Sequence, residues 1–294
     1  GKDAMVSNTT SYENVAVGMD ALQGLVAGSS ANTAIGFEAL KVGNTHSNTA
    51  IGHKALLLTT SGHSNTSVGT GSMAANTTGD NNVAIGLAAL DANTTADNNT
   101  AVGTEALGAN TTGAYNTALG YNSGAATTTG YQNTSVGAHS FDANTTGLYN
   151  VAVGMHSLGA NTTASNNSAL GHQSLYANTT GANNTGIGYY ALNANTTGAN
   201  NVAVGKSSLD ANTTGNSNTA LGADALSADT LGSRNVAIGT SALEVQNFTS
   251  ATNSYNTAIG FNAGAAVTTA IENTLIGGLA GDAITTGNSN VAVG

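Results

Sequence analysis

The chain of 294 residues contains no cysteine, no proline and no tryptophan, and only 7% of its residues are charged. Without cysteine it has neither a disulfide framework nor thiolate ligands for a metal ion. Five Lys and Arg stand against fifteen Asp and Glu, a balance that argues against nucleic-acid binding, which needs a cationic face. No run of 18 apolar residues occurs, so we expect no membrane span.

Few charges and only 4% aromatic residues would suit a disordered chain, but the order of the residues does not. The string Asn-(Val/Thr/Ser)-small-(Val/Ile/Leu)-Gly recurs along the whole sequence. From Gly52 to Gly239 each closing glycine follows the previous one by 17 residues. Elsewhere one step has 18 residues, one has 16 and one has 21. This self-similarity predicts a repeat architecture.

The composition of the repeat is strict at a few positions. We number each repeat from its closing glycine, position 0, and count positions 13 to 16 back from the next glycine. Position 13 is always Asn, position 16 is Val, Ile or Leu, and position 3 is Ala or Ser. Position 4 is usually large and apolar, as at Leu22, Met73 and Phe141, and positions 7 to 10 commonly read Asn-Thr-Thr-Gly.

A 17-residue unit is too short for a helical hairpin repeat, which needs about 33 residues. The alternation around Asn-Val-Ala-Val-Gly is typical of a short strand, and Asn-Thr-Thr-Gly is turn chemistry in which Asn and Gly tolerate positive φ. We therefore predict an all-β fold, a parallel β-solenoid (β-roll or β-helix) of about 17 coils. Residues 1–294 are expected to form a single repeat-array domain, excerpted from a longer fibrous protein because neither end shows a polar cap.

Stacking explains why position 13 never varies. An Asn amide both donates and accepts, so a column of Asn can bond from coil to coil. The predicted structural Asn ladder consists of Asn14, Asn32, Asn48, Asn65, Asn82, Asn99, Asn116, Asn133, Asn150, Asn167, Asn184, Asn201, Asn218, Asn235, Asn256, Asn273 and Asn290.

The strand has two faces, and the sequence suggests an assignment of each. We expect positions 14 and 16 to point into the coil, with position 4 as the opposing wall. The small residues at positions 15 and 0 would then face outward, against neighbouring chains of an oligomer. The only large residue at position 15 is Leu275. The extra residues of the 21-residue repeat, around Phe248–Asn253, are predicted to form a surface loop.

The recurring Asn-Thr-Ala-Ile-Gly and Ala-Leu-x-Ala-Asn-Thr-Thr-Gly strings resemble repeats of bacteriophage and large-virus tail fibres. The Asn-Val-Ala-Ile-Gly element is also similar to the head repeat of trimeric autotransporter adhesins, although the 17-residue period is longer than theirs. The resemblance covers essentially the whole chain. It implies an extended, extracellular and usually trimeric β-roll fibre used in attachment.

Candidate sites are few. We find no catalytic constellation, no metal-ligand set and no cofactor motif, because His and Asp are sparse and a uniform array offers little concavity. Tyr176, Tyr189 and Tyr190 occupy corner positions of neighbouring coils and are the candidates for surface recognition of a sugar or a partner, against the alternative that they fill gaps between coils. Nine Asn-Thr-Thr strings match the N-glycosylation pattern, but turn chemistry accounts for them equally.

The leading hypothesis is a non-catalytic structural shaft of an extracellular attachment fibre, on a virion tail or a bacterial cell surface. Its partner would be itself, as a homo-oligomer such as a trimer or as an end-to-end filament, and a host-surface glycan or receptor could join it. The alternatives are a self-assembling extracellular filament and an ice-binding solenoid with Thr columns. A glycan-degrading enzyme is disfavoured, because it needs two close carboxylates.

Overall fold

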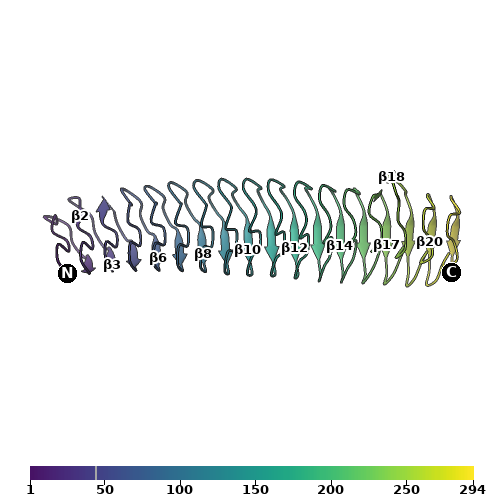
Figure 1. The fold of residues 1–294 in the computed structure, drawn as a ribbon, viewed down its shortest axis with the longest axis horizontal. Helices are drawn as coiled ribbons and strands as arrows, with labels where there is room; N and C mark the ends of the chain where they lie inside the picture. Colours follow the sequence, from purple (N-terminus) through teal and green to yellow (C-terminus); the bar gives the residue numbers. More distant parts are fainter. Residues whose placement is uncertain (44) are drawn as a thin grey trace. The chain divides into compact units, whose positions relative to one another are not determined.

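The computed structural model describes residues 1–43 and 45–294. It contains two compact units, Gly1–Leu148 and Tyr149–Gly294, which we describe separately. The described residues form short β-strands joined by turns and no helix. Within each unit successive strands pair in parallel, side by side (Figure 1). The prediction of an all-β parallel β-solenoid is confirmed.

Each coil contributes one three-residue strand that ends just before its closing glycine. In the first unit these strands are β1 (Val15–Val17), β3 (Thr33–Ile35), β5 (Thr49–Ile51), β6 (Thr66–Val68), β7 (Val83–Ile85), β8 (Thr100–Val102), β9 (Thr117–Leu119) and β10 (Thr134–Val136). In the second unit they are β11 (Val151–Val153), β12 (Ser168–Leu170), β13 (Thr185–Ile187), β14 (Val202–Val204), β15 (Thr219–Leu221), β17 (Val236–Ile238), β19 (Thr257–Ile259), β20 (Thr274–Ile276) and β21 (Val291–Val293).

The register of the stack follows the repeat. Thr100 of β8 pairs with Thr117 of β9, and Ala203 of β14 pairs with Ala220 of β15, so equivalent residues lie beside one another. Outside the strands, backbone groups also bond from coil to coil: the Leu90 N–H donates to the carbonyl of Ala106 over 3.0 Å. The backbone of one coil is therefore the hydrogen-bonding template for the next.

The repeats whose length departs from 17 residues take part in small additional sheets with a neighbouring repeat. In the first unit β2 (Gly24–Leu25) pairs with β4 (Val42–Gly43), and in the second β16 (Gly232–Ser233) pairs with β18 (Thr252–Asn253). The predicted surface loop at Phe248–Asn253 is therefore only partly right. Residues 249–251 are exposed, but the Phe248 side chain is buried and the end of the segment is a paired strand.

The predicted inside and outside of the strands are wrong. The central residue of each strand, position 15, is the buried one: Ala101, Ala152 and Ala203 are fully inaccessible to solvent. The flanking positions 14 and 16 point outward, and Ile85 and Leu170 of position 16 are 40% and 41% exposed. The coil is thin, and the large side chain of position 4 occupies most of its interior. Only a small side chain therefore fits opposite it, at position 15 of the strand.

Position 4 is the opposing wall, as predicted. In the first unit Leu90, Leu107 and their equivalents are buried and pack with the alanines of positions 3 and 15 in one core cluster, and in the second unit Leu209 and its equivalents are buried too. Their backbones are left-handed, with φ of 52° at Leu90 and 51° at Leu209. Positions 2 and 12 are also left-handed in most coils, so the backbone turns sharply at three positions of each such coil.

Leu275 shows that position 15 faces the core. It is fully buried, and the position-4 residues on either side of it are Gly264 and Gly281. A Cβ at Gly264 would lie 2.7 Å from Leu275 Cδ1, and one at Gly281 would lie 2.6 Å from Cδ2. One large side chain on the strand therefore fills the space that two position-4 leucines occupy elsewhere.

The turn prediction needs a correction as well. Neither Asn nor Gly of the Asn-Thr-Thr-Gly segment, as at Asn178 and Gly181, has a positive φ. The closing glycines do, with φ of 139° at Gly103 and 136° at Gly120. A Cβ at Gly103 would also overlap the backbone of Gly120, so close approach of adjacent coils requires glycine at position 0.

Replacing Leu275 by Ala should destabilise the second unit by about 2 to 4 kcal/mol, because it leaves a cavity in the core. Adding Gly264→Leu should recover a large part of that loss, whereas Gly264→Leu alone should overpack the same space. Urea unfolding of the three variants measures the coupling. A neutral Leu275→Ala would show that position 15 does not face the core.

Candidate functional site

The Asn side chains of position 13 bond each coil to the next. The Asn65 N–H donates to Asn48 Oδ1 over 2.9 Å, and Asn65 Nδ2 donates to the carbonyl of Gly79 over 2.8 Å. Asn184 repeats both bonds, with Asn167 Oδ1 at 2.9 Å and the Gly198 carbonyl at 2.8 Å. Each amide thus serves two backbone groups that strand pairing leaves free, and amide-to-amide contacts are secondary.

Burial makes this ladder a structural feature. Fifteen of its seventeen members are buried, while Asn14 and Asn290 of the outermost repeats are more exposed. A side chain that is inaccessible to solvent cannot contact a ligand. The fifteen buried position-13 side chains therefore contact other parts of the chain and not a ligand.

A second buried Asn column lies at position 7. Asn93 Nδ2 donates to Asn76 Oδ1 over 2.9 Å and to the Ala96 carbonyl over 3.1 Å. In the second unit Asn195 Nδ2 reaches Asn178 Oδ1 over 2.8 Å. The sequence analysis interpreted these residues as turn chemistry only. Their recurrence at one repeat position was the same signal that identified the position-13 ladder.

This column also bears on glycosylation. Most Asn of the Asn-Thr-Thr strings are fully buried, namely Asn76, Asn93, Asn110, Asn144, Asn161, Asn178, Asn195 and Asn212, and Asn8 is half-buried. A glycan on Nδ2 would displace the hydrogen bonds of the column. The folded coils are therefore incompatible with N-glycans at these eight positions.

One residue interrupts the second column and another ends it. Thr127 follows Asn110 and Asp229 follows Asn212, and neither replacement donates to the preceding amide. Asn110 Oδ1 and Asn212 Oδ1 are consequently buried without a hydrogen-bond partner. An unpaired buried acceptor costs about 1 to 3 kcal/mol.

Asp229 is a buried carboxyl within this column. It accepts hydrogen bonds from Gln246 Nε2 over 2.7 Å and from the Gly232 N–H over 2.9 Å. Burial raises the pKa of Asp229 above its usual range, and these hydrogen bonds oppose the rise only in part. Because the folded state binds the proton more tightly than the unfolded state, Asp229 favours folding at low pH, and this contribution is lost as pH rises through its raised pKa.

Asp229→Asn should stabilise the second unit at pH 7 by about 1 to 3 kcal/mol, because the new Nδ2 donates to Asn212 Oδ1 and no charge is buried. The variant gives up one of the two acceptor oxygens, so a single Oδ1 remains for Gln246 Nε2 and the Gly232 N–H, and the expected gain is the net of these changes. The gain should shrink as pH falls from the raised pKa of folded Asp229 towards 3.8, the ordinary Asp pKa, because the wild-type carboxyl takes up its proton over that range. Chemical denaturation across this pH range measures it, and a pH-independent or negative effect would contradict the assignment.

Asn184→Ala should destabilise the second unit by about 1 to 3 kcal/mol, because it leaves the Asn201 N–H buried without a partner and removes one of the two donors to the Gly198 carbonyl, the other being Asn195 Nδ2. Thr180→Ala is the matched control, since Thr180 is exposed in the same coil and has no positive φ. Thermal melting of both variants provides the comparison. Equal melting temperatures of the two variants would show that the Asn ladder does not contribute to the stability of the fold.

The three predicted recognition tyrosines lie close to two histidines. Tyr189 stacks on His172, with ring centroids 5.6 Å apart and 11° between planes, and Tyr190 lies 4.3 Å from Tyr189. Tyr176 meets His156 edge-on at 6.0 Å. Tyr176 and Tyr189 are exposed and Tyr190 is half-buried. The two histidine contacts join rings of neighbouring coils, which is what gap-filling requires, whereas Tyr189 and Tyr190 belong to one coil.

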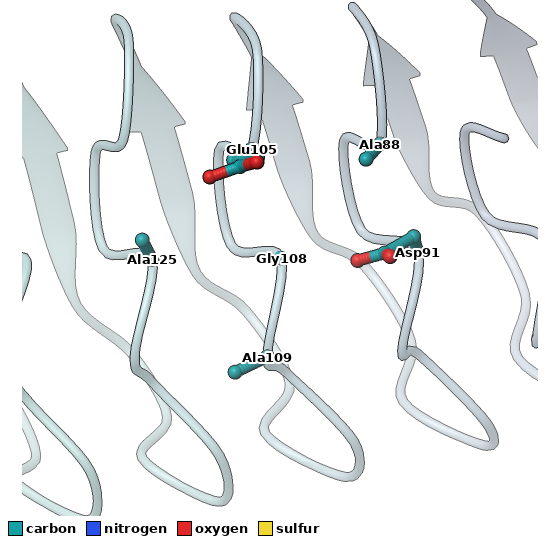
Figure 2. Close-up of a pocket in the computed structure, with 6 residues that line it drawn as sticks. All are labelled: Ala88, Asp91, Glu105, Gly108, Ala109 and Ala125. Atoms are coloured by element: carbon teal, nitrogen blue, oxygen red, sulfur yellow. The ribbon is translucent and has the colours of Figure 1, made fainter. Parts of the chain in front are cut away.

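Two carboxylates border a small pocket in the first unit (Figure 2). The pocket has a volume of about 280 Å³ and is lined by Ala88, Asp91, Glu105, Gly108, Ala109 and Ala125. Burial and the neighbouring Glu105 raise the pKa of Asp91. The sequence analysis found no carboxylate pair because it compared equal repeat positions, whereas Asp91 is at position 5 and Glu105 at position 2 of the next coil.

Across residues 1–43 and 45–294, no three or more His, Cys, Asp or Glu side chains gather in a way that could hold a metal ion. The same residues include no helix with the length and apolar character of a membrane span. No family model, no curated protein and no solved structure matches the chain.

Proposed function

We propose that this array is a non-catalytic structural shaft in an extracellular attachment fibre, of a virion tail or a bacterial cell surface. The supporting observation is that the buried polar side chains bond along the stack. Both Asn columns link one coil to the next, and the half-buried Thr of position 8 does the same, as when Thr94 Oγ1 donates to the Thr111 carbonyl over 3.1 Å. Such a chain transmits load from coil to coil.

The surface gives little support to catalysis. The pocket at Asp91 lies between neighbouring coils and is lined mostly by small residues. Of its six lining residues only Asp91 and Glu105 can exchange a proton. Its shape follows from Gly108, where a Cβ would lie 3.5 Å from Asp91 Oδ1. A missing side chain in a periodic surface is sufficient to explain the indentation. No cofactor is part of the proposal.

Location and attachment rest on the resemblance of the repeats to tail-fibre and adhesin repeats. A host-surface glycan or receptor is a proposed partner, and the exposed edges of Tyr176 and Tyr189 are where a sugar would be met. The shaft itself needs no receptor, because its role is to hold the receptor-binding end of the fibre at a distance from the virion or the cell surface.

Ice binding is less well supported by the Thr columns. Thr94 and its equivalents at position 8 are half-buried and donate to the next coil, whereas Thr95 and its equivalents at position 9 are exposed. The adjacent threonines therefore form one exposed rank rather than two. Matching an ice lattice needs a second rank on the same flat face.

Immunogold labelling of the organism that produces the chain tests the proposed function. Antibodies against residues 149–294 should decorate fibres on virions or on the cell surface, because a shaft is displayed along its length. The purified chain should also leave the viscosity of capsule polysaccharide unchanged. Labelling confined to the cell interior, or a fall in viscosity that Asp91→Asn abolishes, would contradict the proposal.

A further inference from the structure

The outward face of the strands is an apolar surface of unusual regularity. Position 16 carries Val, Ile or Leu on every strand, and in the first unit Ile35, Ile51, Ile85 and Leu119 are 38%, 37%, 40% and 48% exposed. In the second unit Leu170, Ile187, Leu221, Ile259 and Ile276 are exposed to a similar degree. Strand alternation places position 14, which is Thr, Val or Ser, on the same face.

Charge is absent from this face. Position 14 and position 16 hold no Asp, Glu, Lys or Arg in any of the seventeen strands, although the chain has twenty such residues. An ordinary solvated surface intersperses both signs of charge among its side chains. Eight partly exposed aliphatic side chains in the first unit alone present on the order of 500 Å² of apolar surface, the size of the largest patch on a typical monomer, which is often a functional one.

The spacing of the rows indicates which partner fits them. Adjacent parallel strands lie about 4.8 Å apart, so the aliphatic side chains recur at that interval along each unit. Another copy of the chain presents the same rows at the same interval. The aliphatic side chains of the two copies can therefore contact one another at every strand along the face. A partner without this period would match only a few ranks before falling out of register.

We infer that the outward face formed by positions 14 and 16 is the contact between copies of this chain, packed side by side with parallel strands and in axial register. The parallel direction rests on the proposed function, since every chain of an attachment fibre runs from the same root to the same tip. The buried alanines of position 15 take no part in this contact.

Single-cysteine variants test the inference, because the chain has no cysteine of its own. In a parallel, in-register assembly the equivalent residues of neighbouring copies come close enough for a disulfide. Ile85→Cys should form covalent dimers on mild oxidation. Thr95→Cys, exposed in the same unit at position 9, should remain monomeric on a non-reducing gel. Equal cross-linking of the two variants would overturn the inference.

Sedimentation equilibrium of the full chain provides the second measurement. The wild-type mass should correspond to two or more chains of 28.6 kDa each. The pair Ile51→Lys and Ile85→Lys should reduce it to one chain, whereas the control pair Thr78→Lys and Thr95→Lys should leave it unchanged. If the lysine pair does not fold, the cross-linking result decides alone.

A wild-type chain that is monomeric at tens of micromolar and gives no Ile85→Cys dimer would overturn the contact. Thermal hysteresis in such a monomer would assign the face to ice instead. The display of the chain on fibres, measured by immunogold, is independent of these results. Surface labelling together with a monomeric mass would therefore reject the interface and retain the shaft.

Discussion

Each coil must offer the next one the same donors and acceptors at the same places, and the rest of the structure follows from this constraint. A three-residue strand satisfies only a few backbone groups, and the internal bonds of the turns, such as that from the Asn93 N–H to the Leu90 carbonyl, do not satisfy the rest. The position-13 Asn supplies the missing partners, with Oδ1 on one backbone N–H and Nδ2 on a carbonyl of the following coil, as at Asn65. Because an unpaired buried group is costly, the period cannot drift by even one residue in the uninterrupted part of the array.

The sequence alone predicts the fold well, since the 17-residue period specifies one coil and the alternation specifies a strand. It does not say which strand face is inside, because alternation separates two faces without ranking them. Hydrophobicity suggested Ile and Val for the interior, but the position-4 leucine already fills a thin coil. The pairing of Leu275 with Gly264 and Gly281 was visible in the sequence and indicates the correct face through conserved volume rather than hydrophobicity.

The candidate sites were harder to predict, for a related reason. Comparing residues at equal repeat positions identifies columns, such as the Asn ladder, and misses contacts between different positions of adjacent coils. Asp91 and Glu105 line one pocket in this way, and Tyr176 contacts His156. Burial of the position-7 Asn was also hidden, because Asn-Thr-Thr-Gly has the composition of an exposed turn. Local composition describes a turn well but does not tell on which side of the backbone its amide lies.

The left-handed residues of each coil have a consequence for how the array is built. A non-glycine residue in this region costs about 1 to 3 kcal/mol, and coils such as that of Leu209 hold it at several positions, Ser207 and Leu209 among them. No coil can recover that cost from its own contacts, because its polar partners belong to its neighbours. Growth on an existing coil recovers it at once. The array should therefore assemble like a one-dimensional crystal, which is slow to nucleate and quick to extend.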